Sequence, residues 1–142
     1  MSDPRPLHVL LVEDDDVAAE AVMRSMQRAG IPCPVTWVED GQAALDVLRE
    51  QDTKRKAPRP RLVLLDLNMP RMNGFEFLEV VRADPQLKDE VIFVLTTSSA
   101  DSDRSRAYDE NVAGYMVKSS VGPQFSKLIQ LLDGYRCAVQ LP

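Results

Sequence analysis

The sequence contains few of the residues that build disulfide frameworks and zinc sites: two cysteines and one histidine in 142 residues. Cys33 and Cys137 are too few and too far apart in the sequence to predict either kind of site, and His8 stands alone. We interpret all three as structural residues. A disulfide-stabilised secreted domain and a zinc-binding module are therefore excluded as readings of this chain.

Positive charge is also in the minority. Seventeen Lys and Arg residues against 22 Asp and Glu give a net charge of −5 and a pI near 4.9. Nucleic-acid binding needs a positive surface to contact phosphates, and no DNA-reading motif is present. The longest apolar runs reach only about half of a membrane span, and the N-terminal MSDPRP lacks the pattern of a secretory signal. We expect a cytoplasmic protein that binds neither nucleic acid nor membrane.

The composition that remains is that of a globular domain, with 44% hydrophobic and 27% charged residues. A chain of this length builds one buried core. We therefore predict a single domain over residues 1–142, with its core within about 7–134 and a C-terminal extension over 135–142.

Apolar runs typical of buried strands alternate with segments of helical periodicity. The five runs are 7–13 (LHVLLVE), 34–39 (PVTWVE), 61–67 (RLVLLDL), 90–97 (EVIFVLTT) and 113–118 (AGYMVK). Between and after them, apolar residues recur every three or four positions, which predicts five helices. Strands alternating with helices indicate an α/β, doubly wound parallel sheet.

Capping residues and one change of composition mark the boundaries. We expect Gly30 after the first helix, Asp40 and the Asn73–Glu76 capping box before the second and third, Asp101 or Asp103 before the fourth, and Gly134 after the fifth. The segment DTKRKAPRPR (52–61) is basic and Pro-rich and has no apolar anchor. It is interpreted as a solvated connector.

Charged and polar residues stand at the carboxyl ends of the predicted strands, where doubly wound sheets bind ligands. The first strand ends in Glu13 and Asp14, the third in Asp66, the fourth in Thr96 and the fifth in Lys118. Each residue alone has an ordinary explanation as a cap, a turn residue or a solvated side chain. Carboxylates gathered at one sheet edge repel one another unless a cation offsets their charge. The pattern therefore favours a divalent cation with oxygen ligands, and Mg²⁺ suits such a set.

Four motifs, LLVEDDD, LLDLNMPRMNG, VLTTS and GYMVK, resemble the response-regulator receiver domain of two-component signalling over nearly the whole chain. The spacings of 30 residues from Asp66 to Thr96 and 22 from Thr96 to Lys118 are similar to those of that family. The resemblance implies a flavodoxin-like fold of five parallel strands in the order 2-1-3-4-5 with five helices.

The resemblance also implies a role for each strand-end residue. Asp66 would accept a phosphoryl group from the phosphohistidine of a sensor histidine kinase and become 4-aspartylphosphate. Lys118 would pair with the phosphoryl oxygens, Thr96 would hydrogen-bond to them, and Tyr115 would be the switch aromatic. The protein would be a phosphoacceptor in a phosphorelay, catalysing its own phosphorylation and dephosphorylation, and not a turnover enzyme.

The metal site implied by the resemblance holds Mg²⁺. Asp14 would ligate the ion directly, Glu13 through water, Asp66 by its carboxylate and Asn68 by its backbone carbonyl. The chain departs from the family in one place, because Ser119 follows Lys118 where a proline, often after a cis bond, is usual. A non-proline cis bond costs about 3 kcal/mol, so the peptide is either trans or held cis at that cost.

Two alternatives share the fold class. Haloacid-dehalogenase-like phosphatases also use a strand-end Asp nucleophile with Mg²⁺, but they need an acid/base Asp two residues later, and position 68 is Asn. A dinucleotide-binding domain is disfavoured because no G-x-G-x-x-G motif follows the first strand. Turnover of a phosphoester substrate would distinguish a phosphatase from a receiver.

The last residues, GYRCAVQLP (134–142), predict no covalent output domain, so output would pass through a partner. The tail resembles that of single-domain receivers encoded beside bacterial phytochromes, which implies a bacteriophytochrome as the kinase. We expect a symmetric homodimer through the fourth helix, fifth strand and fifth helix, with Tyr135, Val139 and Leu141 in the interface. A constitutive dimer is favoured over an association that phosphorylation shifts, because a hydrophobic tail needs no phosphate to become buried. The alternative is a frayed terminus.

Overall fold

The computed structural model describes residues 6–141 and contains one parallel sheet. Its strands are β1 (His8–Val12), β2 (Val35–Val38), β3 (Arg61–Leu65), β4 (Val91–Thr96) and β5 (Gly114–Val117). Their order, β2-β1-β3-β4-β5, confirms the predicted topology. The central strand β3 is buried along its whole length, as expected for a strand covered on both faces.

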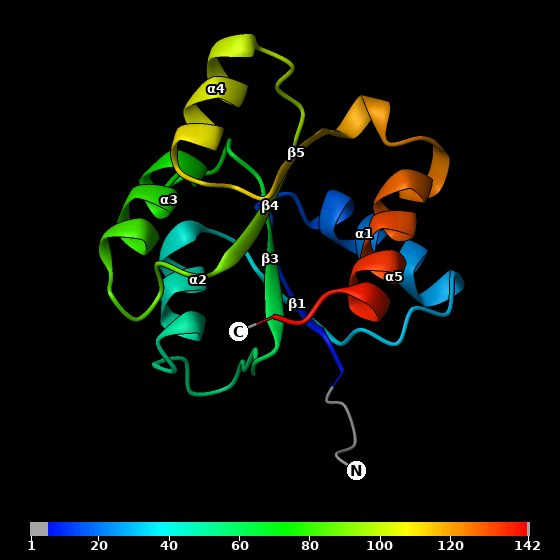
Figure 1. The fold of residues 1–142 in the computed structure, drawn as a ribbon, viewed down its shortest axis with the longest axis horizontal. Coiled ribbons are helices and arrows are strands. Elements are labelled where there is room, and N and C mark those ends of the chain that lie inside the picture. Colours follow the sequence, from blue (N-terminus) through cyan, green and yellow to red (C-terminus); the bar gives the residue numbers. More distant parts are fainter. Residues whose placement is uncertain (1–5, 142) are drawn as a thin grey trace.

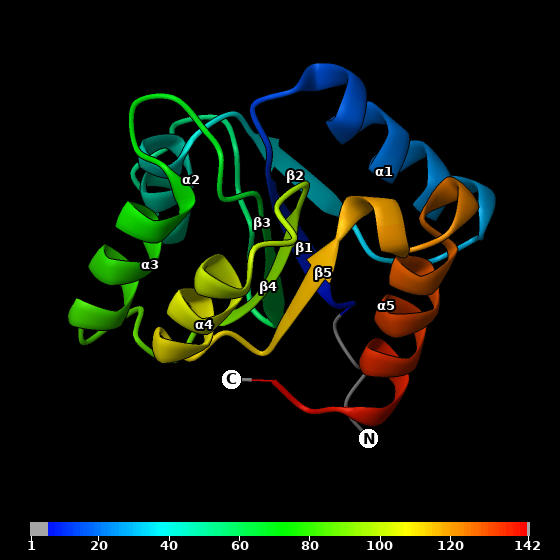
Figure 2. The ribbon, with the colours of Figure 1, turned by 90° about the horizontal axis from the view of Figure 1, so that it is seen from above.

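Helices cover both faces of the sheet. They are α1 (Asp16–Arg28), α2 (Gly41–Leu48), α3 (Gly74–Ala83), α4 (Asp101–Asp109) and α5 (Ser126–Ala138). α1 and α5 lie on one face, and α2, α3 and α4 lie on the other (Figure 1 and Figure 2). The same two views show that the connections between successive strands pass through a helix, which is how parallel strands are joined. No helix among residues 6–141 has the length and apolar character needed to cross a membrane.

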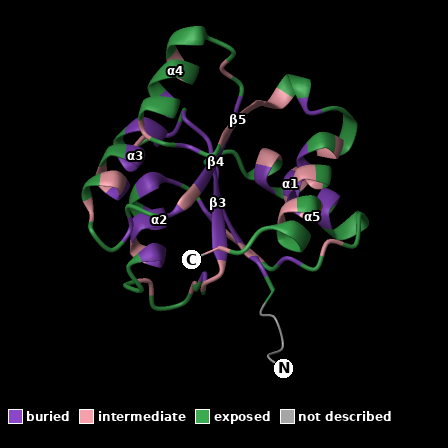
Figure 3. Ribbon diagram, viewed as in Figure 1, coloured by how far each residue is buried: buried purple, intermediate pink, exposed green. Residues whose placement is uncertain are grey.

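Two buried clusters, one on each face of the sheet, form the core. The first joins the sheet to α2 and α3 through residues such as Leu45 and Phe77, and the second joins it to α1 and α5 through residues such as Val22 and Leu128. Figure 3 shows the buried strands between helices whose outer surfaces are exposed. At about 25 cal/mol per Å² of buried apolar surface, these two layers are the main source of stability.

The predicted caps are found at two helices and are absent at a third. Asp40 accepts a hydrogen bond from the backbone N–H of Ala43, and Asn73 forms the expected capping box with Glu76. The prediction for α4 was wrong, because its N-cap is Ala100 and no side chain caps it. Asp103, in the first turn of the helix, instead accepts a hydrogen bond from the Ser98 hydroxyl at 2.6 Å.

The end of α5 also differs from the prediction. The helix continues through Gly134 to Ala138, because Gly134 is exposed and Tyr135 beyond it packs edge-on against Phe93, with ring centroids 5.4 Å apart. Leu141 packs against the second core cluster, whereas Val139 is 42% exposed. The tail therefore partly packs on its own domain, which the sequence did not indicate.

The basic segment over 52–61 is not simply a solvated connector. Ala57 is buried, and Arg61 at the start of β3 forms a two-pronged ion pair with Glu90, at 3.0 and 2.7 Å. The side chains of both partners are almost completely buried, at 5% and 1% exposed. The interpretation failed because the partner carboxylate lies 29 residues away in the sequence.

Candidate functional site

The carboxyl ends of β1 and β3 bring three acidic side chains together. The two strands pair with Val12 opposite Leu65, so the residues that follow, Glu13 and Asp66, leave the sheet side by side. One carboxylate oxygen from each of Glu13, Asp14 and Asp66 lies within 4.8 Å of the others. The strand register thus produces the cluster.

The cluster is unfavourable without a compensating cation. Glu13 and Asp66 are buried, whereas Asp14 is exposed. Burial raises the pKa of Glu13 to about 7; the neighbouring Asp66 raises it as well, and Lys118 opposes the rise. A divalent ion would relieve this repulsion, so the three carboxylates fit Mg²⁺ or a similar ion.

Lys118 supplies a positive charge at the cluster. It begins a short 3₁₀ turn (Lys118–Ser120) directly after β5, forms an ion pair with Glu13, and places its Nζ 3.8 Å from Oδ2 of Asp66. Among residues 6–141 the only cis peptide bond joins Arg59 to Pro60, so the Lys118–Ser119 bond is trans. Where the family usually has a proline after the lysine, this chain therefore has a trans peptide bond between Lys118 and Ser119.

Thr96 and Tyr115 come from β4 and β5, but they lie in different environments. Thr96 is fully buried, and its Oγ1 accepts a hydrogen bond from the Ser98 N–H at 3.4 Å. Tyr115 is half-buried and donates from its hydroxyl to the Ser98 carbonyl at 2.9 Å. Burial raises the pKa of Tyr115, so its hydroxyl stays protonated at neutral pH. Ser98 thus connects the buried threonine to the tyrosine.

The turn after β3 is folded tightly back on itself. Asn68 is exposed, and its backbone N–H donates to Oδ1 of Asp66 at 3.3 Å. Gly74, at the start of α3, donates to the Leu67 carbonyl at 3.0 Å. A Cβ at Gly74 would lie only 2.7 Å from the Asp66 carbonyl oxygen, so no other residue fits without a backbone shift. The glycine allows α3 to begin beside the acidic cluster.

One contact at the site was not predicted. The indole N–H of Trp37, on β2, donates a hydrogen bond to the backbone carbonyl of Glu13 at 2.7 Å. The run 34–39 indicates only that Trp37 belongs to a buried strand, and no sequence spacing indicates a contact across 24 residues. The side chain therefore has a polar role as well as a packing role.

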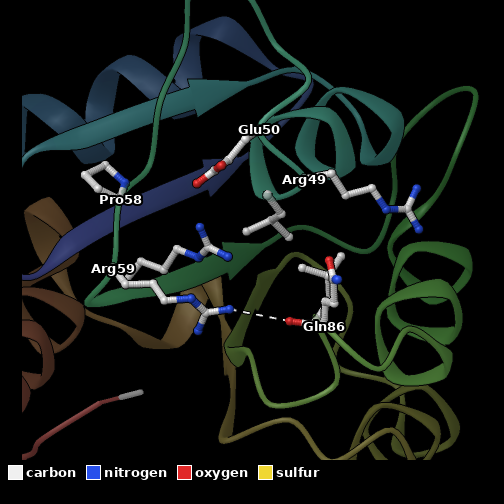
Figure 4. A pocket seen from close by; sticks show the side chains of 8 residues that line it. Arg49, Glu50, Pro58, Arg59 and Gln86 are labelled. Atoms are coloured by element: carbon white, nitrogen blue, oxygen red, sulfur yellow. Dashed lines mark hydrogen bonds between the residues drawn. The ribbon is translucent and has the colours of Figure 1, made fainter.

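A cavity of about 450 Å³ lies away from this site, beside the amino end of β3. Its lining includes Arg49, Glu50, Arg59 and Gln86, and Arg59 donates to the Gln86 carbonyl at 3.5 Å (Figure 4). Arg59 also pairs with Glu90, while Arg49 pairs with Asp84. The arginines of this lining are therefore already engaged by carboxylates of the chain, with Arg59 and Arg61 sharing Glu90.

Comparisons with known proteins agree with the geometry. A family model described as the response regulator receiver domain matches residues 9–132. The probable methanogenesis regulatory protein FilR2 of Methanothrix harundinacea is 40% identical over 92% of this chain and 83% of its own length. Response regulator Rcp1 of Synechocystis is 33% identical over 92% of this chain and 88% of its own length.

Solved structures show the same resemblance in three dimensions. The phosphorylated cyanobacterial phytochrome response regulator RcpA superimposes with a TM-score of 0.80 at 32% identity, covering 97% of this chain and 99% of that one. The Mn²⁺-bound form of Rcp1 superimposes with a TM-score of 0.78 at 32% identity, covering 96% and 99%. Both share the fold along nearly their full lengths.

Proposed function

Because the chain belongs to the response regulator receiver domain family, we propose that it accepts a phosphoryl group on Asp66 from a sensor histidine kinase and signals by binding a partner. The observation that carries the proposal is the position of Asp66, beside two further carboxylates and 3.8 Å from the Lys118 ammonium. Incubation with acetyl phosphate and Mg²⁺ tests it. Intact-mass measurement should then show one added phosphoryl group.

The chemistry requires a carboxylate nucleophile and neutralisation of charge. One Asp66 oxygen attacks phosphorus, forming the P–O bond of the acyl phosphate while the P–N bond to the donor histidine breaks and its imidazole leaves. When bound, Mg²⁺ held by Glu13, Asp14 and Asp66 would neutralise charge on the phosphoryl oxygens. Lys118 then pairs with a phosphoryl oxygen in place of a carboxylate, and the Thr96 hydroxyl donates to another.

A partner that delivers the phosphoryl group must approach this edge of the sheet. Val17, in the first turn of α1, is 73% exposed and lies three residues beyond Asp14, so it offers an apolar contact beside the site. The name of RcpA, a cyanobacterial phytochrome response regulator, supports a bacteriophytochrome-type kinase as the donor. Since such kinases use ATP, we place the reaction in the cytoplasm.

We further propose that phosphorylation is read at the face of α4, β5 and α5. Thr96, Ser98 and Tyr115 connect the site to this face through the two hydrogen bonds at Ser98. Movement of Thr96 toward a phosphoryl oxygen would therefore disturb the backbone that holds Tyr115. The same face is our proposed homodimer interface, because Tyr108 on α4 and Val139 in the tail remain 48% and 42% exposed.

The first prediction concerns Mg²⁺. We expect millimolar-range affinity for wild type, because a few carboxylates and a carbonyl form a mostly hydrated site. Asp14→Asn should weaken binding by about tenfold, since it removes a charge from an exposed ligand. An NMR titration with MgCl₂ measures both constants. Asp16→Asn, an exposed acid two residues further on and outside the cluster, is the control. Equal affinities in Asp14→Asn and wild type would move the ion elsewhere.

The second prediction concerns the tail. Removing residues 139–142 leaves α5 intact, including Tyr135, and deletes Val139 and Leu141. We expect the truncated protein to shift from dimer toward monomer in light scattering, because the exposed Val139 would no longer be available to the partner copy and Leu141 would no longer hold the tail against the second core cluster. Gln140→Ala, which keeps both apolar side chains, is the control. A truncated protein that stays fully dimeric excludes residues 139–142 from the interface, and a monomeric full-length protein in both phosphorylation states rejects the dimer.

A further inference from the structure

The position of the Asp14 carboxylate depends on the backbone that carries it. Among residues 6–141 no hydrogen bond or ion pair holds this side chain, and it is exposed. The turn around it is fixed on both sides, since the Glu13 N–H donates to the Val38 carbonyl at 3.0 Å and the Asp15 N–H to Oε2 of Glu13 at 3.3 Å. What remains to be fixed is the peptide between Glu13 and Asp14.

Trp37 fixes that peptide. Its indole N–H donates at 2.7 Å to the Glu13 carbonyl, which belongs to the peptide unit joining Glu13 to Asp14. The ring is half-buried against the second core cluster, and its strand pairs with β1 so that Leu11 lies opposite Trp37. The donor is therefore anchored by packing and by the sheet, and it holds the carbonyl in one orientation.

The backbone of Trp37 is itself supported from the basic segment. Arg55 donates to the Trp37 carbonyl at 3.4 Å and to Glu39 at 2.9 Å, and its Nε donates to Asp52 at 2.9 Å. β2 is the edge strand of the sheet, with a neighbour on one side only. Arg55 thus steadies the free edge of the strand that carries the indole.

We infer that Trp37 is a positioning residue for the metal site: by holding the Glu13–Asp14 peptide, it places the Asp14 carboxylate where a divalent cation needs it. The inference rests on the proposed metal site. Groups behind metal ligands commonly change affinity by tenfold or more when they are removed. A purely structural Trp37 would affect unfolding and leave the affinity for the ion unchanged.

The test compares Mg²⁺ binding with thermal unfolding. In Trp37→Phe, which keeps an aromatic ring and removes the N–H, we expect Mg²⁺ affinity to fall by about tenfold in an NMR titration. Phosphorylation by acetyl phosphate should slow at limiting Mg²⁺ and recover at saturating Mg²⁺, because the nucleophile is untouched. The matched control is Thr36→Val, at the residue before Trp37 on β2. It removes the hydrogen bonds of the Thr36 hydroxyl with His8 and with the Lys56 carbonyl and leaves the hydrogen bond to Glu13 intact. It should bind Mg²⁺ like wild type.

A second variant separates the hydrogen bond from packing. Trp37 is the only tryptophan in the chain, so biosynthetic replacement of tryptophan by benzothienylalanine exchanges its N–H for sulfur and keeps the ring's shape. Weakened Mg²⁺ binding in this protein supports the inference. Wild-type affinity in it, or in a folded Trp37→Phe protein, overturns the inference while leaving the metal site in place. Wild-type affinity in Asp14→Asn overturns both.

Discussion

Phosphorylation by acetyl phosphate is expected to disappear when Asp66 is replaced by Asn. The amide has nearly the shape of the carboxylate but is not a nucleophile, so the acyl phosphate cannot form. Intact-mass measurement should show the added phosphoryl group in wild type and none in Asp66→Asn. We expect Asp66, and not the exposed acids of the chain, to be the acceptor, because its carboxylate lies 3.8 Å from the Lys118 ammonium that would pair with the phosphoryl oxygens.

Two controls show whether the loss of phosphorylation in Asp66→Asn is specific to that residue. One tests whether the variant is folded, and the other tests the substitution of a different acid. Asp66→Asn should be at least as stable as wild type, because it removes one of three carboxylates that share the site. Asp89→Asn, an exposed position before β4, should be phosphorylated like wild type. If Asp66→Asn gains a phosphoryl group as readily as wild type, another residue is the acceptor and the proposed function is wrong.

The fold class could be predicted from the sequence because the patterns that indicate it are local, whereas the strand order 2-1-3-4-5 was implied only by the resemblance to the receiver family. Five apolar runs alternate with helical periodicity, and parallel strands that need crossover connections leave few possible topologies. Once the strands are placed, their carboxyl ends meet at one edge, so Glu13, Asp66 and Lys118 converge without any knowledge of side-chain geometry. Residues at strand ends are therefore the part of a site that sequence analysis finds most readily.

Contacts within the site depend on neighbours across the sheet and were beyond such an analysis. Trp37 reaches the Glu13 carbonyl because β2 pairs with β1. The apolar pattern of residues 34–39 predicts a buried strand but not this hydrogen bond. The extension of α5 through Gly134 is decided by the packing of Tyr135 on Phe93, which outweighs the weak helix propensity of one glycine. Tertiary packing determines both features.

The largest effect on stability is expected from Glu90→Gln. The Glu90 carboxylate accepts two hydrogen bonds from the Arg61 guanidinium and also forms an ion pair with Arg59 at 3.0 Å. The remaining nitrogen of Arg61 donates to the Ala57 carbonyl at 2.9 Å. The amide removes the negative charge and leaves the buried Arg61 guanidinium without a counter-ion. Breaking a buried pair in this way costs about 3–5 kcal/mol, a large share of the 5–15 kcal/mol by which a typical domain is stable.

Chemical denaturation measures this loss, and an exposed ion pair supplies the control. Glu39→Gln breaks the ion pair with Arg55, in which the Glu39 side chain is 55% exposed and the Arg55 side chain 36% exposed. Because water screens this pair, the substitution should lower the free energy of unfolding by only about 0–1 kcal/mol. Replacing Arg61 and Glu90 together by Met should recover much of the stability lost in Glu90→Gln, since no unpaired charge remains buried. Equal losses in Glu90→Gln and Glu39→Gln would show that burial of the Arg61–Glu90 pair contributes nothing to the folded state.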